Sequence, residues 1–192
     1  MALSSYDDLL VSIPKWAMRE GDIQFEAMVP DFIALAEDLM NNGTDDIPPI
    51  RTREMETDTT LTLVDGVASL PLDYLEARSI RYGSENRDLP FHDADFVGGE
   101  FRSTRNGISP LALGYYAKIP ALGPDNQTNW LILKNKQVYL YGALLVSSPF
   151  MLDDARLATW GTLYTKAIIG LTSTDFRGRY SRATVRTAGA TP

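Results

Sequence analysis

Apolar residues near the N-terminus recur at the spacing of an α-helix. Leu9 and Ile13 follow Ser5, which is a favourable N-cap residue, and acidic residues occupy the first turn, where the helix dipole favours negative charge. Pro14 predicts a kink or a break near Ile13, because proline lacks a backbone N–H and its ring clashes with the preceding turn. Residues 19–22 then predict the end of this helical segment.

A second helical pattern follows Pro30, a residue type that suits the first turn of a helix. Four apolar residues then share one predicted face: Phe32, Leu35, Ala36 and Leu39. Residues 41–43 read Asn-Asn-Gly and predict the C-terminal end, since Asn and Gly tolerate the left-handed conformation. The prolines within residues 45–49 predict a stiff linker after the helix.

The period then changes from helical to alternating. Residues 59–64 and 67–70 read as two strands around Asp65-Gly66, and a two-residue Asp-Gly connection is a strong signal for a β-hairpin. The pairing that this turn predicts is Val64 with Val67, Leu63 with Ala68, and Leu61 with Leu70.

Further strands are predicted over residues 77–82 and 113–119. Residues 84–110 have a mixed composition rich in Gly, Asp and Arg, which predicts mostly loop with a short helical turn near residues 93–96. A loop rich in Pro, Gly and Asn is predicted over residues 120–128.

Two apolar helices are predicted in the C-terminal part. Nearly every residue over 137–146 is apolar, which indicates a helix that is buried on most sides, and residues 147–149 predict its end. Asp153 and Asp154 predict the start of the next helix. Its core stripe is predicted at these residues: Leu157, Trp160, Tyr164, Ile168 and Leu171.

These elements predict an α+β fold. We expect a helical bundle made of residues 1–50 and 121–175, with a small antiparallel β lobe inserted over residues 51–120. We expect residues 176–192 to form an extended basic C-terminal arm.

Charge is distributed unevenly along the chain. Residues 176–192 contain four arginines and no acidic residue, so this segment carries +4; because the net charge is −7, residues 1–175 carry −11. The distribution is compatible with a solvated terminus and with an arm that binds an acidic partner. The candidate binding residues of that arm are Arg177, Arg179, Tyr180, Arg182 and Arg186.

Composition excludes several kinds of chemistry. The chain has no cysteine, which rules out disulfides, thiolate metal sites and thiol catalysis, and His92 is its only histidine. No apolar run approaches the ~18 residues of a membrane span, and the N-terminus does not resemble a secretory signal. We therefore expect no membrane partner, and assembly in a reducing cytoplasm.

His92 lies beside Asp93 and Asp95, and this is the one place where the sequence resembles a catalytic or metal-binding cluster. A metal-dependent nuclease or a lytic hydrolase would use such a loop, but a single histidine with two acids is also typical of an exposed loop. Residues 98–101, Gly-Gly-Glu-Phe, resemble the signature of diguanylate cyclases without its second acid, and a Gly-Gly turn explains them equally. We predict no catalytic residues, no metal and no cofactor.

The order of several phrases along the chain resembles the head-to-tail adaptor (connector) family of short-tailed phages. The C-terminal half carries YYAKIPAL at 115–122, TNWL at 128–131, YLYGAL at 139–144 and DDAR at 153–156. The N-terminal half carries PDFIALAE at 30–37, REME at 53–56 and LPLDYLEAR at 70–78.

The resemblance implies a structural protein of the virion, located at the head–tail interface and assembled in the host cytoplasm. Such a protein forms a ring, of twelve subunits by resemblance, below the portal protein; it extends the DNA channel and docks the tail or nozzle protein. The resemblance implies that genomic DNA passes without specific binding and that the basic arm contacts the portal. Two alternatives stay open at this point, a small phage enzyme that uses the His92 loop and a tail-completion subunit.

Overall fold

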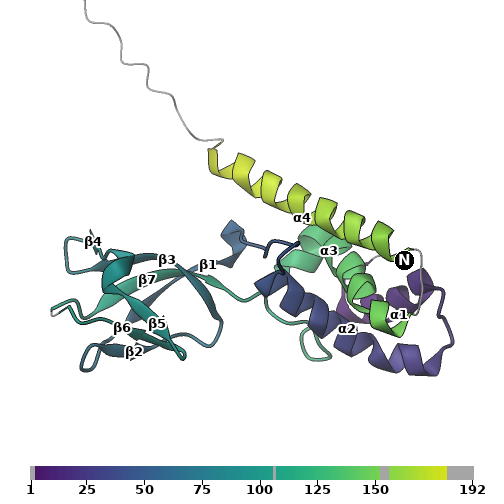
Figure 1. Cartoon of the computed structure of the whole chain (residues 1–192), viewed down its shortest axis with the longest axis horizontal. Coiled ribbons are helices and arrows are strands. Elements are labelled where there is room, and N and C mark those ends of the chain that lie inside the picture. Colours follow the sequence, from purple (N-terminus) through teal and green to yellow (C-terminus); the bar gives the residue numbers. More distant parts are fainter. Residues whose placement is uncertain (1–2, 106, 152–155, 181–192) are drawn as a thin grey trace, which may run out of the picture. The chain divides into compact units, whose positions relative to one another are not determined.

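The computed structural model describes residues 3–105, 107–151 and 156–180. The chain divides into two compact units, a helical unit of residues 1–50 and 122–192 and a β unit of residues 51–121. Four helices pack together, and two small antiparallel sheets are inserted between the second and third helices (Figure 1). The predicted α+β class is therefore confirmed.

The helical unit consists of α1 (Tyr6–Ala17), α2 (Ile23–Asn42), α3 (Trp130–Val146) and α4 (Leu157–Tyr180). Helix α3 contacts each of the other three helices and lies at the centre of the unit. Gly142 of α3 lets both α2 and α4 pack closely against α3. A Cβ there would lie 3.1 Å from the Tyr164 ring and 3.3 Å from the Ala36 methyl group.

Helix α1 begins where the sequence predicts and runs past the expected break. The Ser5 side chain accepts a hydrogen bond from the Asp8 N–H at 3.1 Å, which is the predicted N-cap. Of the predicted kink or break near Ile13, the break is wrong, because the helix continues to Ala17 and ends with Met18 in the left-handed conformation (φ 56°). Pro14 lies in the last turn, and its missing N–H removes only one helical hydrogen bond.

Helix α2 starts earlier than predicted. Asp22 caps it by accepting the Phe25 N–H at 3.2 Å, so Pro30 lies inside the helix and not in its first turn. The predicted end is confirmed, with Gly43 at a φ of 68°. The predicted apolar face is partly wrong, since Leu35 is 51% exposed while Val29, Ile33 and Met40 are buried. The buried face of α2 therefore includes Phe32 and Ala36 of the predicted stripe but is centred on other residues than Leu35.

Helix α3 is longer than the predicted segment 137–146. Asn129 caps it by accepting the N–H groups of Leu131 and Ile132, and the helix is interrupted at Asn135, which has non-helical dihedral angles. The Asn135 side chain donates to the Ala167 carbonyl at 3.3 Å and so connects this break to α4. The predicted end at residues 147–149 is confirmed, and a short 3₁₀ helix, η3 (Ser148–Phe150), follows it.

The predicted stripe of α4 is largely confirmed. Trp160, Tyr164, Ile168 and Leu171 are buried, and Leu157 is half-buried. The predicted caps, Asp153 and Asp154, lie outside the described residues.

The expected start of the arm at residue 176 needs a correction, because α4 continues through residues 176–180. Asp175, which is 3% exposed, continues the buried side of the helix beyond Leu171. Residues 181–192 lie outside the described residues.

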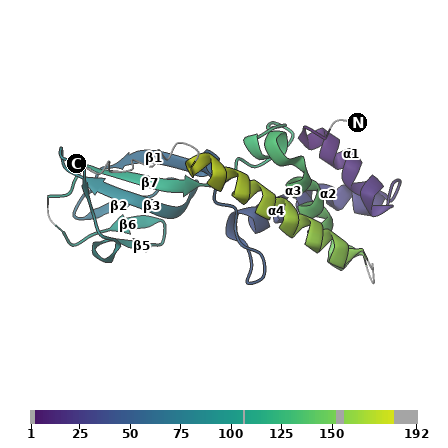
Figure 2. The same cartoon turned by 90° about the horizontal axis from the view of Figure 1, so that it is seen from above.

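The β unit contains two antiparallel sheets. The larger has the order β1 (Glu56–Leu61), β7 (Leu111–Ala117), β3 (Tyr74–Tyr82) and β4 (Arg87–Asp88), and the smaller has the order β2 (Val67–Ser69), β6 (Glu100–Arg102) and β5 (Asp95–Val97). Figure 2 shows β1, β7 and β3 side by side. Both sheets contribute to one core that includes these buried residues: Leu61, Ile80, Phe101, Leu111, Leu113 and Tyr115.

The predicted hairpin is correct at its turn and wrong beyond it. Val64 and Val67 form two backbone hydrogen bonds of 2.9 and 3.0 Å around Asp65-Gly66, which have φ values of 52° and 80°. The strands then separate: β1 pairs with β7, which places Leu61 opposite Leu111, and β2 pairs with β6, which places Ala68 opposite Phe101. The core contacts of the two sheets outweigh the local pairing, because each strand buries its apolar residues better on a different partner.

Residues 84–110 are also more ordered than predicted. They contain β4, β5, β6 and a 3₁₀ turn, η2 (Phe91–Asp93), which lies slightly before the predicted turn at 93–96. These strands are only two or three residues long, so their alternation was too short to show in the sequence. A second 3₁₀ turn, η1 (Arg53–Met55), precedes β1.

Candidate functional site

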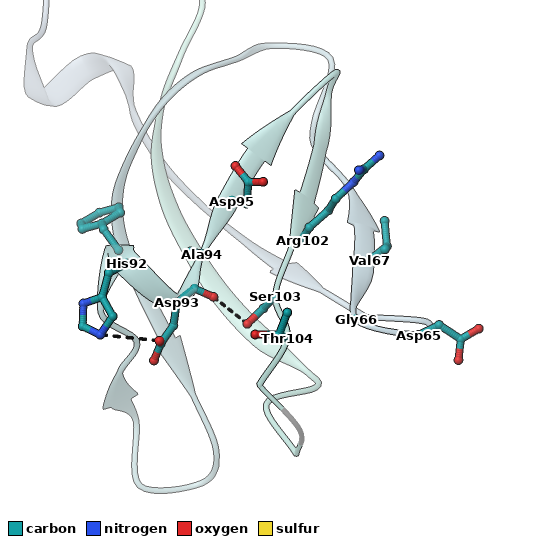
Figure 3. Close-up of a pocket in the computed structure, with 11 residues that line it drawn as sticks. Asp65, Gly66, Val67, His92, Asp93, Ala94, Asp95, Arg102, Ser103 and Thr104 are labelled. Atoms are coloured by element: carbon teal, nitrogen blue, oxygen red, sulfur yellow. Dashed lines mark hydrogen bonds and ion pairs between the residues drawn. The ribbon is translucent and has the colours of Figure 1, made fainter.

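The His92 loop borders a shallow hollow of about 700 Å³ in the β unit (Figure 3). Turn η2 and strand β5 form one side of the hollow, and strand β6 and the Asp65-Gly66 turn form the other. Its polar lining consists of these residues: Asp65, His92, Asp93, Asp95, Arg102, Ser103 and Thr104.

Asp93 has a structural role in this hollow. Its carboxylate lies 3.2 Å from the Arg105 guanidinium and 3.5 Å from His92 Nε2, and its backbone carbonyl accepts the Ser103 hydroxyl at 2.7 Å. Figure 3 shows Asp95 further along β5, apart from the Asp93 and His92 side chains. The His92 side chain is 79% exposed.

The geometry does not assemble the cluster that the sequence raised as a metal site. Among the described residues, no three His, Asp or Glu side chains come together in a way that could hold a metal ion. The Asp93 carboxylate already has a cationic partner, and Asp93 ties η2 to the segment that follows β6. The arrangement supports loop packing and provides no acid–base pair for hydrolysis.

We expect His92→Ala and Asp95→Ala to leave the assembly of the protein unchanged, together with the infectivity of the phage that the sequence resemblance implies. Both side chains are exposed, and surface substitutions without special contacts usually change the free energy of unfolding by about 0.5 kcal/mol or less. Infectivity measured by plaque counts, together with the metal content of the purified protein, tests this expectation. Normal particles that are no longer infectious, or a metal that these substitutions remove, would show a functional site in this loop.

In the Gly-Gly-Glu-Phe segment, the two glycines form a turn and the phenylalanine is part of the core. Gly98 and Gly99, with φ values of 62° and 80°, connect β5 to β6, and Phe101 is fully buried against Phe96. A left-handed turn of this kind favours glycine. The cyclase-like segment is therefore explained by the hairpin.

A buried polar cluster, which sequence reasoning missed, connects three segments of the helical unit. Glu37 of α2 is 6% exposed, and its carboxylate accepts the Leu122 N–H at 2.8 Å and the Tyr139 hydroxyl at 3.0 Å. The Asn129 amide in turn donates to the Tyr139 oxygen at 2.6 Å. No local signal indicates this cluster, because its members are far apart in the sequence. Within the helical unit it fastens the loop before α3 to α2.

Burial raises the pKa of Glu37, although the hydrogen bonds from Leu122 and Tyr139 act in the opposite direction. The folded protein therefore holds this proton more tightly than the unfolded chain, whose glutamate has the ordinary pKa of 4.5. The cost of burying the charge is fully present above the folded-state pKa and is relieved as the pH falls through that value toward 4.5.

We expect Glu37→Gln to remove this contribution to the pH dependence of stability. Relative to the variant, the wild-type protein should gain free energy of unfolding as the pH is lowered from 7 toward the ordinary pKa of glutamate. Urea unfolding at a series of pH values measures the difference, and Glu20→Gln, at an exposed glutamate, is the matched control. A constant difference between wild type and Glu37→Gln across the series would contradict the expectation.

The structure describes the candidate arm only in part. Arg177 is exposed on α4, and Arg179 and Tyr180 are the last of the five candidate residues that lie within the same helix. Arg182 and Arg186 lie outside the described residues. The structure therefore brings no complete binding site together from these five residues.

In the β unit, the Tyr115 hydroxyl donates a hydrogen bond to the Asp73 carboxylate at 3.0 Å. Burial and this aspartate raise the pKa of Tyr115 to about 12, so the hydroxyl stays protonated as a donor. No helix in the described part of the chain is both long and apolar enough to cross a membrane. The fold is thus of the α+β class, and the described residues of the hollow bring no metal-binding cluster together.

The sequence model described as "SU10 adaptor protein" matches residues 4–188. This chain therefore belongs to the SU10 adaptor protein family and is a phage head-to-tail adaptor, a structural protein of the virion. The resemblance seen in the ordered phrases is confirmed. The family is structural, and no enzyme family is indicated. A search of curated proteins finds no match.

Proposed function

We propose that this adaptor forms a ring of twelve subunits below the portal protein, where it extends the DNA channel and docks the tail or nozzle protein. The observation that carries the proposal is the family match, which spans nearly the whole chain and both structural units. In this arrangement the helical unit builds the wall of the ring, and the β unit faces the tail or a neighbouring subunit.

The charge distribution supports a channel through which DNA passes without binding. Residues 1–175 carry a net charge of −11. An acidic wall repels the phosphate backbone weakly, so the genome slides past it, whereas a basic wall would hold DNA through phosphate neutralisation.

The basic C-terminal segment supports a separate contact with the portal. It begins on α4, where Arg177 is exposed, and carries the remaining arginines in residues 179–186. Guanidinium groups form paired hydrogen bonds with carboxylates, so an acidic groove on the portal is the matching receptor.

Mass measurement of the full-length protein, alone and with purified portal, tests this function. We expect a portal complex whose mass corresponds to a closed ring of adaptor subunits. Equimolar mixtures with the tail protein alone are the control. A protein that binds the tail protein but never the portal would instead be a tail-completion subunit, and a protein that binds the portal as isolated monomers would contradict the ring.

A further inference from the structure

An apolar groove with two lysines lies on the helical unit between α1 and α3. It has a volume of about 410 Å³, and its lining includes Lys15, Trp16, Lys136, Leu140 and Tyr141. The Trp16 ring is 51% exposed and meets the Tyr141 ring edge to face, with 6.1 Å between the ring centroids. Trp16 is exposed and Tyr141 is half-buried, and Trp and Tyr are residue types that are enriched among those that dominate binding energy at protein interfaces.

The end of α1, which contributes Trp16 to the groove, is held in place by Arg156. The Arg156 guanidinium donates to the backbone carbonyls of Trp16 and Ala17 at 3.4 and 3.1 Å, and this guanidinium also stacks on the Trp160 ring at 5.1 Å. These contacts fix the last turn of α1 to the start of α4. The Trp16 backbone is therefore positioned before any partner arrives, which lowers the entropic cost of docking.

The outer side of α2 carries a complementary stripe. Its members are all exposed and follow each other at steps of three and four residues: Gln24, Met28, Asp31, Leu35, Asp38 and Asn42. Leu35 is 51% exposed and lies between the two carboxylates, and Met28, which is 36% exposed, lies one turn before Asp31. Asp31 and Asp38 lie roughly 10 Å apart along the helix axis, given a rise of about 1.5 Å per residue.

We propose that the α2 stripe of one subunit docks into the α1–α3 groove of the next copy of this chain. Leu35 would enter the groove beside Trp16, and the two aspartates of the stripe would face Lys15 and Lys136. The two surfaces match in charge and in apolar character, and both belong to one compact unit of the chain. Lys15 is available for this exchange, since its present contact with Glu20 is an exposed pair at 3.5 Å.

A contact between two different surfaces of the same chain repeats from subunit to subunit and closes into a ring when the rotation between neighbours permits. This inference rests on the ring of the proposed function and identifies the surfaces that build it. Opposite charges at the rim fix the register of such a contact, and like charges in the same place oppose it.

A charge exchange tests the interface. We expect the variant Asp31→Lys/Asp38→Lys and the variant Lys15→Asp/Lys136→Asp each to lose self-association on the portal by roughly tenfold or more, because each then places like charges in contact. A mixture of the two variants should assemble again, since the basic stripe of one meets the acidic groove of the other. The control, Asp45→Lys/Asp46→Lys, makes the same charge change on the exposed linker and should assemble normally.

Cross-linking provides a second measurement. The chain has no cysteine, so Leu35→Cys with Gln137→Cys creates the only thiols, one on the stripe and one on the lining of the groove. Oxidation of the assembled portal complex should yield a ladder of covalent multimers. The control pair Leu35→Cys with Thr162→Cys, which uses an exposed position on α4, should yield none.

The possible outcomes separate the two proposals. Wild-type rings that form no stripe-to-groove cross-link, or folded charge variants whose mixture stays dispersed, would overturn this interface and leave the ring intact. Charge variants that each assemble like the wild type would overturn it as well. A wild-type protein that never multimerises on the portal would overturn the ring, and with it this interface.

Discussion

Replacing Trp160 with alanine is expected to lower the free energy of unfolding of the helical unit by roughly 3–5 kcal/mol, the usual range when a buried aromatic side chain is truncated. Trp160 is 4% exposed, and its ring also carries the guanidinium of Arg156, which caps the end of α1. The substitution therefore leaves a cavity beneath α4 and releases a contact between α4 and α1.

Urea unfolding followed by circular dichroism measures this change. The matched control is Ile169→Ala on the same helix, whose side chain is 56% exposed and whose loss should change the free energy of unfolding by only about 0.5 kcal/mol. An unfolding midpoint for Trp160→Ala that equals the wild-type value within error would contradict the packing of α4 described above.

Removing residues 181–192 is expected to leave the fold intact and to weaken binding to the portal strongly. The truncation begins after Tyr180, because residues 176–180 belong to α4 and their removal would shorten a packed helix. Replacing all four arginines, Arg177, Arg179, Arg182 and Arg186, with alanine should weaken binding and remove much of its salt dependence, since salt screens exposed charges.

Co-sedimentation with purified portal at low and moderate salt measures both effects. Circular dichroism of the truncated protein controls for the fold. Equal binding by the full-length and truncated proteins would show that docking does not need residues 181–192.

Short-range signals in the sequence determined the parts of the fold that depend on neighbouring residues. Ser5 caps α1, and the Asp65-Gly66 turn forms with the expected pair of hydrogen bonds. The stripe from Trp160 to Leu171 lies on the buried side of α4. Each of these features is fixed within about one or two turns of chain, where capping, turn conformation and helical periodicity act. The ordered phrases along the whole chain also determined the family.

Tertiary structure decided what those signals could not specify. The Asp-Gly turn sets only the pairing beside it, so the separation of β1 and β2 into different sheets depends on Leu111 and Phe101, which lie far along the chain. Pro30 suits the first turn of a helix, yet α2 begins seven residues earlier, at Ile23, because Phe25 and Val29 are buried in the core.

Some candidate functional surfaces are visible in the sequence, and others are formed only by the tertiary structure. The arginine-rich segment and the His92 loop are visible in the sequence, because their residues are adjacent. The Glu37 cluster, the α1–α3 groove and its lysines join residues separated by about a hundred positions, and only the packing of α3 against its neighbours brings them together. Sequence periodicity specifies which face of a helix is apolar, whereas the choice of partner for that face is a long-range property of the packed core.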